Sequence, residues 1–162
     1  PASAPARQAG EVVPHYGGVF DVPGATLRPP KDQDLKLRFD VREGAAPGEL
    51  NLQFDTVARF LNMQGRAGVP RDRVRAALIV HGTAGKDLLT DAEYRTRYGK
   101  ENPNVRLLDE LKAAGVRIYL CGQTSVGRNL PRAVVTPAAE IALSAMVAHL
   151  VLDKEGYVLN PF

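Results

Sequence analysis

The sequence predicts an α/β fold, a single small domain in which helices flank both faces of a mostly parallel sheet. The main observation is alternation: short apolar segments typical of strands alternate with segments whose apolar residues recur every three or four positions, as on one face of a helix. Connections of this kind lead from one parallel strand to the next through a helix packed on the sheet. The length of 162 residues fits one domain, and the sequence shows no internal repeat.

The first 34 residues are expected to form an extended arm, and residues 35–162 the α/β domain. The arm shows no helical or strand period, and turn-forming residues interrupt it at Pro14, Gly17, Gly18, Pro23, Gly24, Pro29 and Pro30. It also has apolar side chains to bury, at Val12, Val13, Tyr16, Val19 and Phe20. We therefore expect the arm to lie over the domain or against a neighbouring subunit.

The domain begins with a strand, a turn and a long helix. Apolar and charged residues alternate over residues 35–42, which is the period of a strand. Residues 44–48 consist of glycine, alanine and proline and predict a turn. From residue 49 to residue 67 the apolar positions fall three or four apart, which predicts a helix, and Gly68 is placed to end it.

A buried strand, a loop and a polar helix come next. Residues 74–80 include five consecutive apolar residues, a run typical of strands that are covered on both faces. Residues 81–85 are predicted to form a flexible loop, and residues 87–98 a short polar helix. We interpret its acidic residues Asp87, Asp91 and Glu93 as a solvated face.

The remaining residues predict a helix, a strand, a second short strand, a final helix and an edge element. Asn102 and Pro103 form a typical helix start, and Gly115 is placed to end that helix. Residues 116–120 predict a strand, and a short strand is expected near residues 133–135. The pair Thr136 and Pro137 predicts the start of a final helix that runs to about residue 152. Residues 156–159 are expected to add a last element at the edge of the sheet.

Composition and charge argue against several classes of function. The net charge is +3 with both signs interspersed, and the chain has neither an arginine-rich arm nor an aromatic stacking pattern, so we expect no nucleic-acid partner. The longest apolar stretch, at residues 141–152, is too short to span a bilayer, so we expect no membrane insertion. One cysteine and three scattered histidines do not make a zinc site, and we expect neither a metal nor a cofactor.

The compartment is suggested only by the first six residues. The stretch of alanine, serine and proline at residues 1–6 is similar to the small-residue region that follows a signal cleavage site. We therefore expect a periplasmic protein, with the cytoplasm as the alternative. A single cysteine favours neither compartment, because it has no partner with which to form a disulfide.

Cys121, the only cysteine, is the predicted functional residue. It directly follows an apolar strand and precedes small and polar residues, and the carboxyl edge of an α/β sheet is where such folds bind their ligands. If a helical turn begins there, its free N–H groups favour the thiolate over the thiol. The chain cannot close an internal disulfide, so thiol chemistry must involve a partner molecule. The alternative is that Cys121 is a buried side chain that acts as a small hydrophobe.

Several neighbours are candidates for binding sulfur at Cys121. Gly122 permits a close approach of the backbone, while Gln123 and Thr124 can donate hydrogen bonds, and Arg128 is a candidate positive charge over the pocket. His81 and Gly82 directly follow the neighbouring strand, and the carboxyl ends of parallel strands meet at one edge of a sheet. His81 is therefore predicted to be a base or hydrogen-bond partner of the thiol, with a loop histidine bonded to backbone as the alternative.

The residues Ile118-Tyr119-Leu120-Cys121-Gly122-Gln123-Thr124 resemble those of the DsrE/DsrF-like sulfurtransferase family. A strand that ends in His81-Gly82, a proline-started helix before the cysteine strand, and the terminal Glu155-Gly156-Tyr157 agree with this resemblance, which covers roughly residues 35–162. It implies a small α/β fold that assembles as trimers, hexamers or mixed oligomers. It also implies that Cys121 carries sulfur as a persulfide, received from a protein or small-molecule donor and passed to an acceptor.

Two other classes of function remain open from the sequence. Some proteins that share this fold lack the cysteine or serve as structural partners, so the chain is alternatively a non-catalytic binding or assembly module. A third interpretation is a small-molecule binding protein in which the loop at His81 and the polar helix at residues 87–98 act as a lid.

Overall fold

Five strands form one parallel sheet in the computed structural model, which describes residues 1–162. The strands lie in the order β4-β3-β2-β1-β5, and each neighbouring pair is parallel. Their bounds are Leu35–Val41 (β1), Val74–Val80 (β2), Arg117–Cys121 (β3), Glu140–Ala142 (β4) and Val158–Leu159 (β5). The predicted parallel sheet is therefore confirmed.

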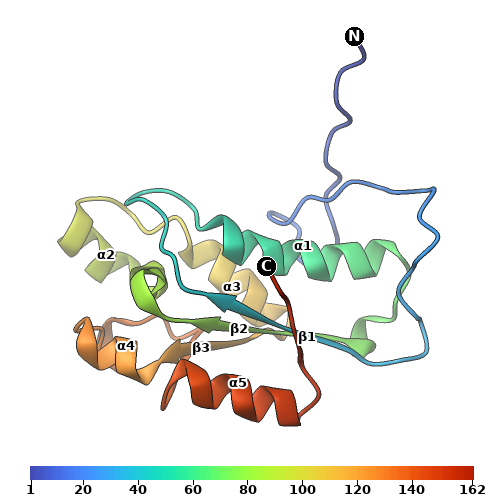
Figure 1. Ribbon diagram of the computed structural model, residues 1–162. Helices are drawn as coiled ribbons and strands as arrows, with labels where there is room; N and C mark the ends of the chain where they lie inside the picture. Colours follow the sequence, from blue (N-terminus) through green and yellow to red (C-terminus); the bar gives the residue numbers. More distant parts are fainter.

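Helices cover both faces of this sheet, as the fold class predicted (Figure 1). The helices α1 and α3 lie on one face, and α5 lies on the other with α4 beside it. The α-helices are α1 (Leu52–Arg66), α2 (Asp91–Tyr98), α3 (Val105–Ala113), α4 (Gly122–Gly127) and α5 (Ala145–Lys154). Three 3-10 helices connect them, namely η1 (Arg71–Arg73), η2 (Gly82–Leu88) and η3 (Arg132–Val134).

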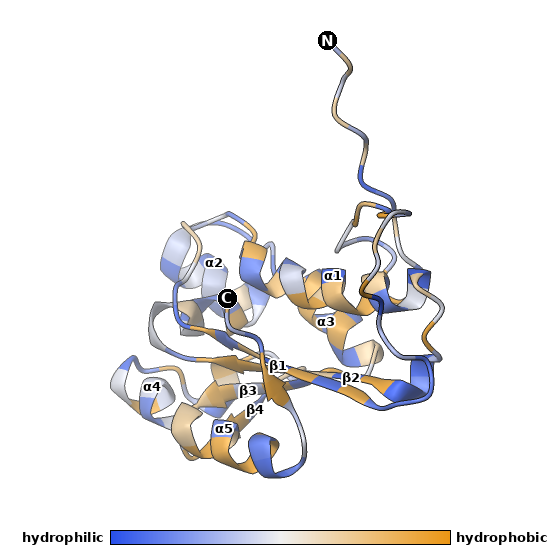
Figure 2. Cartoon of the chain, turned by 45° about the vertical axis from the view of Figure 1, so that its right-hand side comes forward, coloured by the Kyte–Doolittle hydropathy of each residue, from blue (hydrophilic) through white to orange (hydrophobic).

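The two faces of the sheet have cores of very different size. A cluster of 26 buried apolar residues fills the space between the sheet and the helices α1 and α3. The α5 face has a cluster of five, formed by Ala77, Ile79, Ala148, Leu152 and Tyr157. Figure 2 shows apolar residues concentrated in the strands and on the sides of α1 and α3 that meet them. The larger core therefore lies on the side away from α5.

Strand alternation decides which side chains share the α5 face. Successive residues of a strand point to opposite sides of the sheet. In β1, Phe39 and Val41 belong to the larger core, so Arg38 and Asp40 point towards α5. In β3, Leu120 belongs to the larger core, so Cys121 also points towards α5. A polar row thus lies under α5, and it contains the predicted functional cysteine.

Two elements after β3 differ from the prediction. Residues 133–135 do not form a strand: Arg132–Val134 is the 3-10 helix η3, and the fourth strand is β4 at residues 140–142. The final helix does not begin at Thr136-Pro137 but at Ala145, because Ser144 accepts a hydrogen bond from the backbone N–H of Val147 and caps the helix there (3.0 Å). The Thr136 hydroxyl instead accepts from the N–H of Ala138 in a local turn (3.2 Å).

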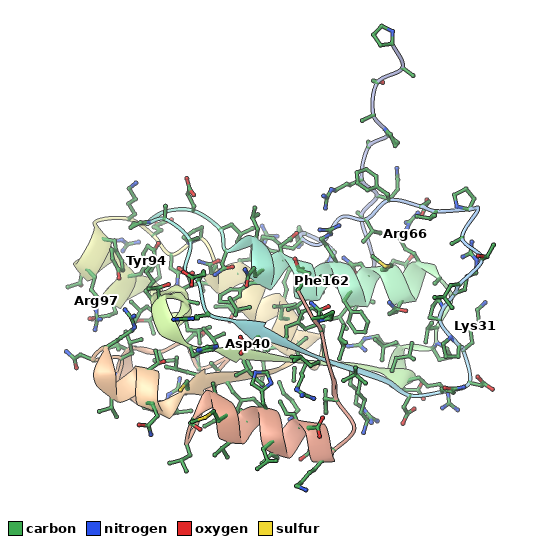
Figure 3. The ribbon with its side chains drawn as sticks, viewed as in Figure 1. Lys31, Asp40, Arg66, Tyr94, Arg97 and Phe162 are labelled. Atoms are coloured by element: carbon green, nitrogen blue, oxygen red, sulfur yellow. The ribbon has the colours of Figure 1, made fainter.

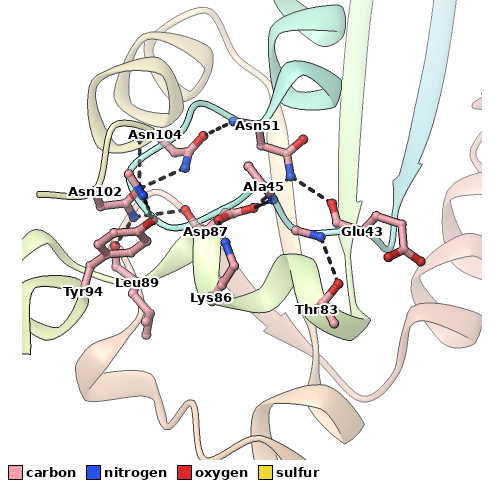
Figure 4. Close-up of polar contacts among 12 residues, drawn as sticks. Glu43, Ala45, Asn51, Thr83, Lys86, Asp87, Leu89, Tyr94, Asn102 and Asn104 are labelled. Carbon is pink, nitrogen blue, oxygen red and sulfur yellow. Dashed lines mark hydrogen bonds and ion pairs between the residues drawn. The ribbon is translucent and has the colours of Figure 1, made fainter. Parts of the chain in front are cut away.

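The segment after β2 also differs from the prediction, because residues 82–88 form a packed 3-10 helix rather than a flexible loop. Asp87 was predicted to lie on a solvated face, and this prediction is wrong because the residue is fully buried. Its carboxylate accepts from Lys86 Nζ (2.6 Å), the N–H of Ala45 (3.0 Å) and Asn51 Nδ2 (2.9 Å), as Figure 4 shows. A buried carboxylate with three donors holds the loop after β1 against η2, which fixes the carboxyl edge of the sheet.

The arm lies over α1 from about residue 8 onward, while its first residues extend away from the domain (Figure 1). The side-chain amide of Asn62, in α1, makes two hydrogen bonds with one residue of the arm. It accepts from the N–H of Val13 (2.9 Å) and donates to the carbonyl of Val13 (3.0 Å). Arg66, labelled in Figure 3, pairs with Asp21 (2.7 Å). The arm therefore covers α1, which lies on the face of the sheet opposite to α5. No helix of the chain is long and apolar enough to cross a membrane.

Candidate functional site

Cys121 is the last residue of β3 and the N-cap of α4, as its position in the sequence suggested. It lies at the carboxyl edge of the sheet, paired with Ala142 of β4. The residue is buried, and 6% of its surface remains accessible to solvent. Cys121 lines none of the five main surface cavities, whose volumes range from 250 to 530 Å³.

The beginnings of two helices meet at the Cys121 sulfur. Burial raises the pKa of the thiol, but hydrogen-bond donors lower it by more, so the pKa falls below its ordinary value of 9.0. These donors are the backbone N–H groups of Thr124, Ala145 and Gln123 and the hydroxyl of Thr124. Gln123 and Thr124 belong to the first turn of α4, and Ala145 is the first residue of α5. None of these donors makes a well-aligned hydrogen bond with the sulfur, so several weaker interactions act together to favour the thiolate.

Gly122 lets the segment between β4 and α5 approach this thiol. A Cβ atom at position 122 would lie 2.5 Å from the carbonyl oxygen of Ala142 and 2.9 Å from that of Leu143. The Gln123 amide also donates to the Leu143 carbonyl (3.3 Å). Because any larger residue at position 122 would push this segment away, Gly122 keeps the N–H of Ala145 near the sulfur.

Thr124 connects the thiol to the loop after β2. Its hydroxyl oxygen accepts a hydrogen bond from the backbone N–H of Gly82 (3.1 Å), which leaves the hydroxyl proton available to the Cys121 sulfur. Gly82 has a φ of 59°, in the left-handed region that favours glycine. Two of the residues predicted from sequence, Thr124 and Gly82, therefore meet beside Cys121.

His81 follows β2 directly and is half-buried, but its hydrogen-bond partner is Asp40 rather than the thiol. His81 Nε2 lies 3.0 Å from both carboxylate oxygens of Asp40. The same carboxylate binds His149 of α5, whose Nε2 lies 2.8 Å from Asp40 Oδ1. Figure 3 places Asp40 between β1 and α5. Neither interpretation from the sequence describes this contact, because the His81 ring binds a side chain and that side chain is Asp40 rather than Cys121.

Arg128 is not brought to the thiol. It is exposed and forms the C-cap of α4, whereas Cys121 is the N-cap of the same helix. A rise of about 1.5 Å per residue separates the two ends of this helix by roughly 10 Å. The direction of the helix therefore explains why spacing in the sequence did not translate into proximity.

The sequence did not predict a role in the site for Asp40, Arg38 or His149. The available signal was the alternating pattern of residues 35–42, whose charged positions served only to identify the strand period. In a sheet with helices on both faces, both sides of an inner strand are at least partly covered. Here Arg38 is buried and Asp40 stays exposed, so the charge of Arg38 in particular needs partners. No group of three or more His, Cys, Asp or Glu side chains is arranged to hold a metal ion.

Comparison with known proteins agrees with this architecture. The family model described as the DsrE/DsrF-like family matches residues 37–161, which confirms the resemblance seen around Cys121. A protein of unknown function from Methanobacterium thermoautotrophicum, MTH1491, is similar in structure with a TM-score of 0.59 and 15% identity, over 78% of this chain and 98% of that chain. The ychN protein from E. coli gives a TM-score of 0.49 and 19% identity, over 77% and 97% of the two chains. No curated protein matches the sequence.

Proposed function

The chain belongs to the DsrE/DsrF-like family, and from this premise we propose that it is a sulfur-handling protein that carries sulfane sulfur on Cys121 and transfers it to a partner. Membership of this family suggests a role in sulfur relay. The observation that supports the more specific proposal is the position of the only thiol at the end of β3, where α4 and α5 both begin. Donors from these two helix starts lower the pKa of Cys121. The thiolate, not the thiol, is the nucleophile in sulfur chemistry.

The proposed reaction has two steps of the same kind. The Cys121 thiolate attacks the sulfane sulfur of a donor, the sulfur–sulfur bond of the donor breaks, and the leaving group departs with the electron pair. The persulfide formed on Cys121 then presents its outer sulfur to the thiolate of an acceptor, which restores Cys121. With no second cysteine in the chain, the persulfide cannot be discharged internally as a disulfide. This property suits a carrier.

Access to the sulfur is proposed to run along the seam between α4 and the start of α5. The residues on either side of this seam, Gln123 and Leu143, are exposed. The exposed area of Cys121 is small, so a donor reaches the sulfur only if its own sulfur atom is unhindered or if the seam opens slightly. The donor is therefore expected to present a terminal sulfur rather than a bulky group.

We also propose that the protein forms a homo-oligomer through the outer surface of β4 and α5. This apolar surface is formed by the exposed residues Ile141, Leu143, Met146, Val147, Leu150 and Val151. On α5, Met146 and Leu150 are one turn apart, as are Val147 and Val151, so their side chains form one stripe. Because β4 is an edge strand, a second copy placed here would lie beside Cys121. Light scattering after chromatography measures the oligomer size, and Leu150→Lys is expected to reduce it.

The test of sulfur carriage is the intact mass of reduced protein after incubation with polysulfide or thiosulfate. We expect the mass to rise by whole sulfur atoms, to return after treatment with a reductant, and to stay constant in Cys121→Ser. Periplasmic location, predicted from residues 1–6, stays a separate prediction that fractionation of the native organism would check.

The alternative is a binding or assembly module of the same fold without thiol chemistry, and the near-complete burial of Cys121 is the observation that favours it. This alternative predicts that wild-type protein gains no sulfur and that the thiol is inert to a small alkylating agent. It also predicts that Cys121→Ser forms the same oligomers as the wild type.

A further inference from the structure

Four side chains under α5 form a continuous chain of polar contacts that the sulfur-carrier proposal does not use. Arg38 Nε donates to His149 Nδ1 (3.0 Å), His149 Nε2 contacts Asp40 Oδ1 (2.8 Å), and Asp40 binds His81 Nε2 (3.0 Å). The chain runs from β1 to α5, back to β1, and on to the residue that follows β2. Arg38 is anchored at its other end by the Tyr157 carbonyl and by Asp153 (3.2 Å).

Donor and acceptor chemistry fixes the proton positions in this chain. The Arg38 guanidinium only donates, so His149 Nδ1 must accept and carries no proton. His149 is therefore neutral, and its Nε2–H donates to Asp40. The Asp40 carboxylate has only acceptor oxygens when ionised, so His81 Nε2 also carries a proton. Burial raises the pKa of Asp40, but the hydrogen bonds from His149 and His81 lower it more, which keeps the carboxylate ionised.

One ring nitrogen at the end of this chain remains available. His81 Nδ1 has no hydrogen-bond partner, and it is not among the buried polar atoms that lack one, so it is open to solvent. With a proton held on Nε2 by a carboxylate, Nδ1 is the basic nitrogen of the neutral ring. A histidine oriented by a carboxylate in this way is the arrangement that accepts protons from nucleophiles.

His81 is also the residue next to Cys121 across the sheet. Val80 of β2 pairs with Leu120 of β3, and His81 and Cys121 each come one position later. Val80 and Leu120 both point into the larger core, so the residues after them point towards α5. Neighbouring strands lie about 4.8 Å apart, so the side chains at positions 81 and 121 are neighbours on the same face of the sheet.

We propose that Asp40 and His149 are positioning residues that hold His81 as the acid–base partner of Cys121 in sulfur transfer from a persulfide donor. This inference rests on the proposed function. His81 Nδ1 takes the proton of the Cys121 thiol, and the thiolate attacks the outer sulfur of R–S–SH. The new sulfur–sulfur bond forms as the old one breaks, Cys121–S–SH results, and R–S⁻ leaves. His81 then gives its proton to R–S⁻ to form R–SH, so protons and electrons balance without an oxidant.

The test separates this proton transfer from simple thiol reactivity. A glutathione persulfide donor releases a basic thiolate, which a proton from His81 stabilises as it leaves, whereas iodoacetamide releases iodide, which takes no proton. For His81→Ala we expect the rate of sulfur uptake from the persulfide to fall about 10²-fold, the lower part of the range for general acid–base catalysis, and the rate of alkylation to fall much less. Asp40→Asn keeps an acceptor for His81 but removes the charge, and we expect a smaller loss of uptake that Asp40→Glu restores in part.

The pH profile provides a readout that a merely structural role would not change. The charged and titratable groups around His81 are Asp40 and Arg42 from β1 and its following loop, His149 from α5, and Cys121 from β3. Because Asp40→Asn removes the carboxylate that holds the His81 ring, this substitution is expected to change the pH dependence of sulfur uptake. Asp153→Asn is the matched control, because Asp153 contacts Arg38 but neither histidine, and it should leave the profile unchanged.

The outcomes distinguish failure of the acid–base role of His81 from failure of the sulfur-carrier proposal. If wild-type protein takes up sulfur and His81→Ala takes it up at the same rate, the acid–base role is overturned while the sulfur-carrier proposal stands. If the wild type takes up no sulfur from any donor, both fail. Should Asp40→Asn unfold, nitrogen chemical shifts of the wild-type imidazoles decide instead. We expect a neutral ring protonated at Nε2 for His149, and a proton on Nδ1 of His149 would contradict the positioning argument.

Discussion

The two faces of the sheet differ in what lies between the strands and the helices. On the α1 and α3 face the space is filled by the larger apolar core. On the α5 face five buried apolar residues share the space with Arg38, Asp40, His81 and Cys121. Burial of apolar area supplies most of the favourable free energy of folding, whereas buried polar groups contribute little net stability and require partners. The first face therefore stabilises the domain, and the second is the face on which the proposed chemistry depends.

The strongest test of this difference is Phe54→Ala on the face covered by α1 and α3, which is called the stable face below. Phe54 is fully buried in the larger core, and truncation of such a residue costs about 3–5 kcal/mol of unfolding free energy. Chemical denaturation measures this loss. The fraction that remains folded should still take up sulfur at the wild-type rate. A loss below about 1 kcal/mol, the usual effect of an average substitution, would contradict the assignment of stability to this face.

Gly122→Ala tests the α5 face at its tightest approach. The new Cβ would lie 2.5 Å from the Ala142 carbonyl oxygen, and overpacking of this kind costs about 1–3 kcal/mol. Displacement of the β4–α5 segment also removes the N–H of Ala145 from the sulfur, so the pKa of Cys121 should rise. Denaturation and pH-dependent alkylation measure the two effects.

Gly127 provides the matched control in the same helix. A Cβ atom at position 127 would meet no other atom within 4 Å, so Gly127→Ala should leave both the stability and the thiol pKa close to wild type. Equal effects of the two substitutions would show that loss of glycine in α4, rather than the close approach at position 122, is responsible.

Thr124→Val is expected to change reactivity more than stability. It removes a hydroxyl that binds Gly82 and faces the Cys121 sulfur, at a cost of about 1 kcal/mol. With one donor fewer, the pKa of Cys121 should rise towards its ordinary value of 9.0, and alkylation at neutral pH should slow. Thr96→Val is the control, because that hydroxyl binds only a carbonyl within α2. An unchanged alkylation midpoint in Thr124→Val would remove the hydroxyl from the account of the thiol.

The smallest expected effect is the acid dependence of stability at Asp40. Its pKa is lowered in the folded state, so its contribution to stability is present above the ordinary value of 3.8 and is lost as the pH falls through the folded value. Urea unfolding of wild type and Asp40→Asn should therefore differ at neutral pH and converge between about pH 4 and pH 2. A constant difference across this range would mean that the charge on Asp40 does not stabilise the α5 face.

The stable face was largely predictable from the sequence, because local pattern and tertiary packing agree there. The alternation in β1, the apolar run of β2 and the helical period of α1 all appear at the predicted places. At Thr136 the local pattern predicted a helix start that the structure does not have. A threonine before a proline is typical of a helix start, but the N–H of Thr136 binds the Leu88 carbonyl (2.8 Å), and this long-range bond keeps the segment extended.

The candidate site was only partly predictable, since its contacts join residues that are distant in the sequence. Cys121, Gly122 and Thr124 follow one another, and their role could be inferred from a strand followed by a helical turn. The pairing of Asp40 with His149 spans 109 positions and depends on which face of β1 lies under α5. Strand period shows that Asp40 and Arg38 share a face but does not identify the helix that covers it.

The position of α5 between the fourth and fifth strands has a consequence for biosynthesis. It follows β4 at one edge of the sheet and precedes β5 at the opposite edge, where Leu37 pairs with Val158. Chains emerge from the ribosome from their N-terminus, so the stable face has all its elements before α5 is made. The thiol of a nascent chain stays uncovered until α5 has been made, and oxidants have their best access to Cys121 during that interval.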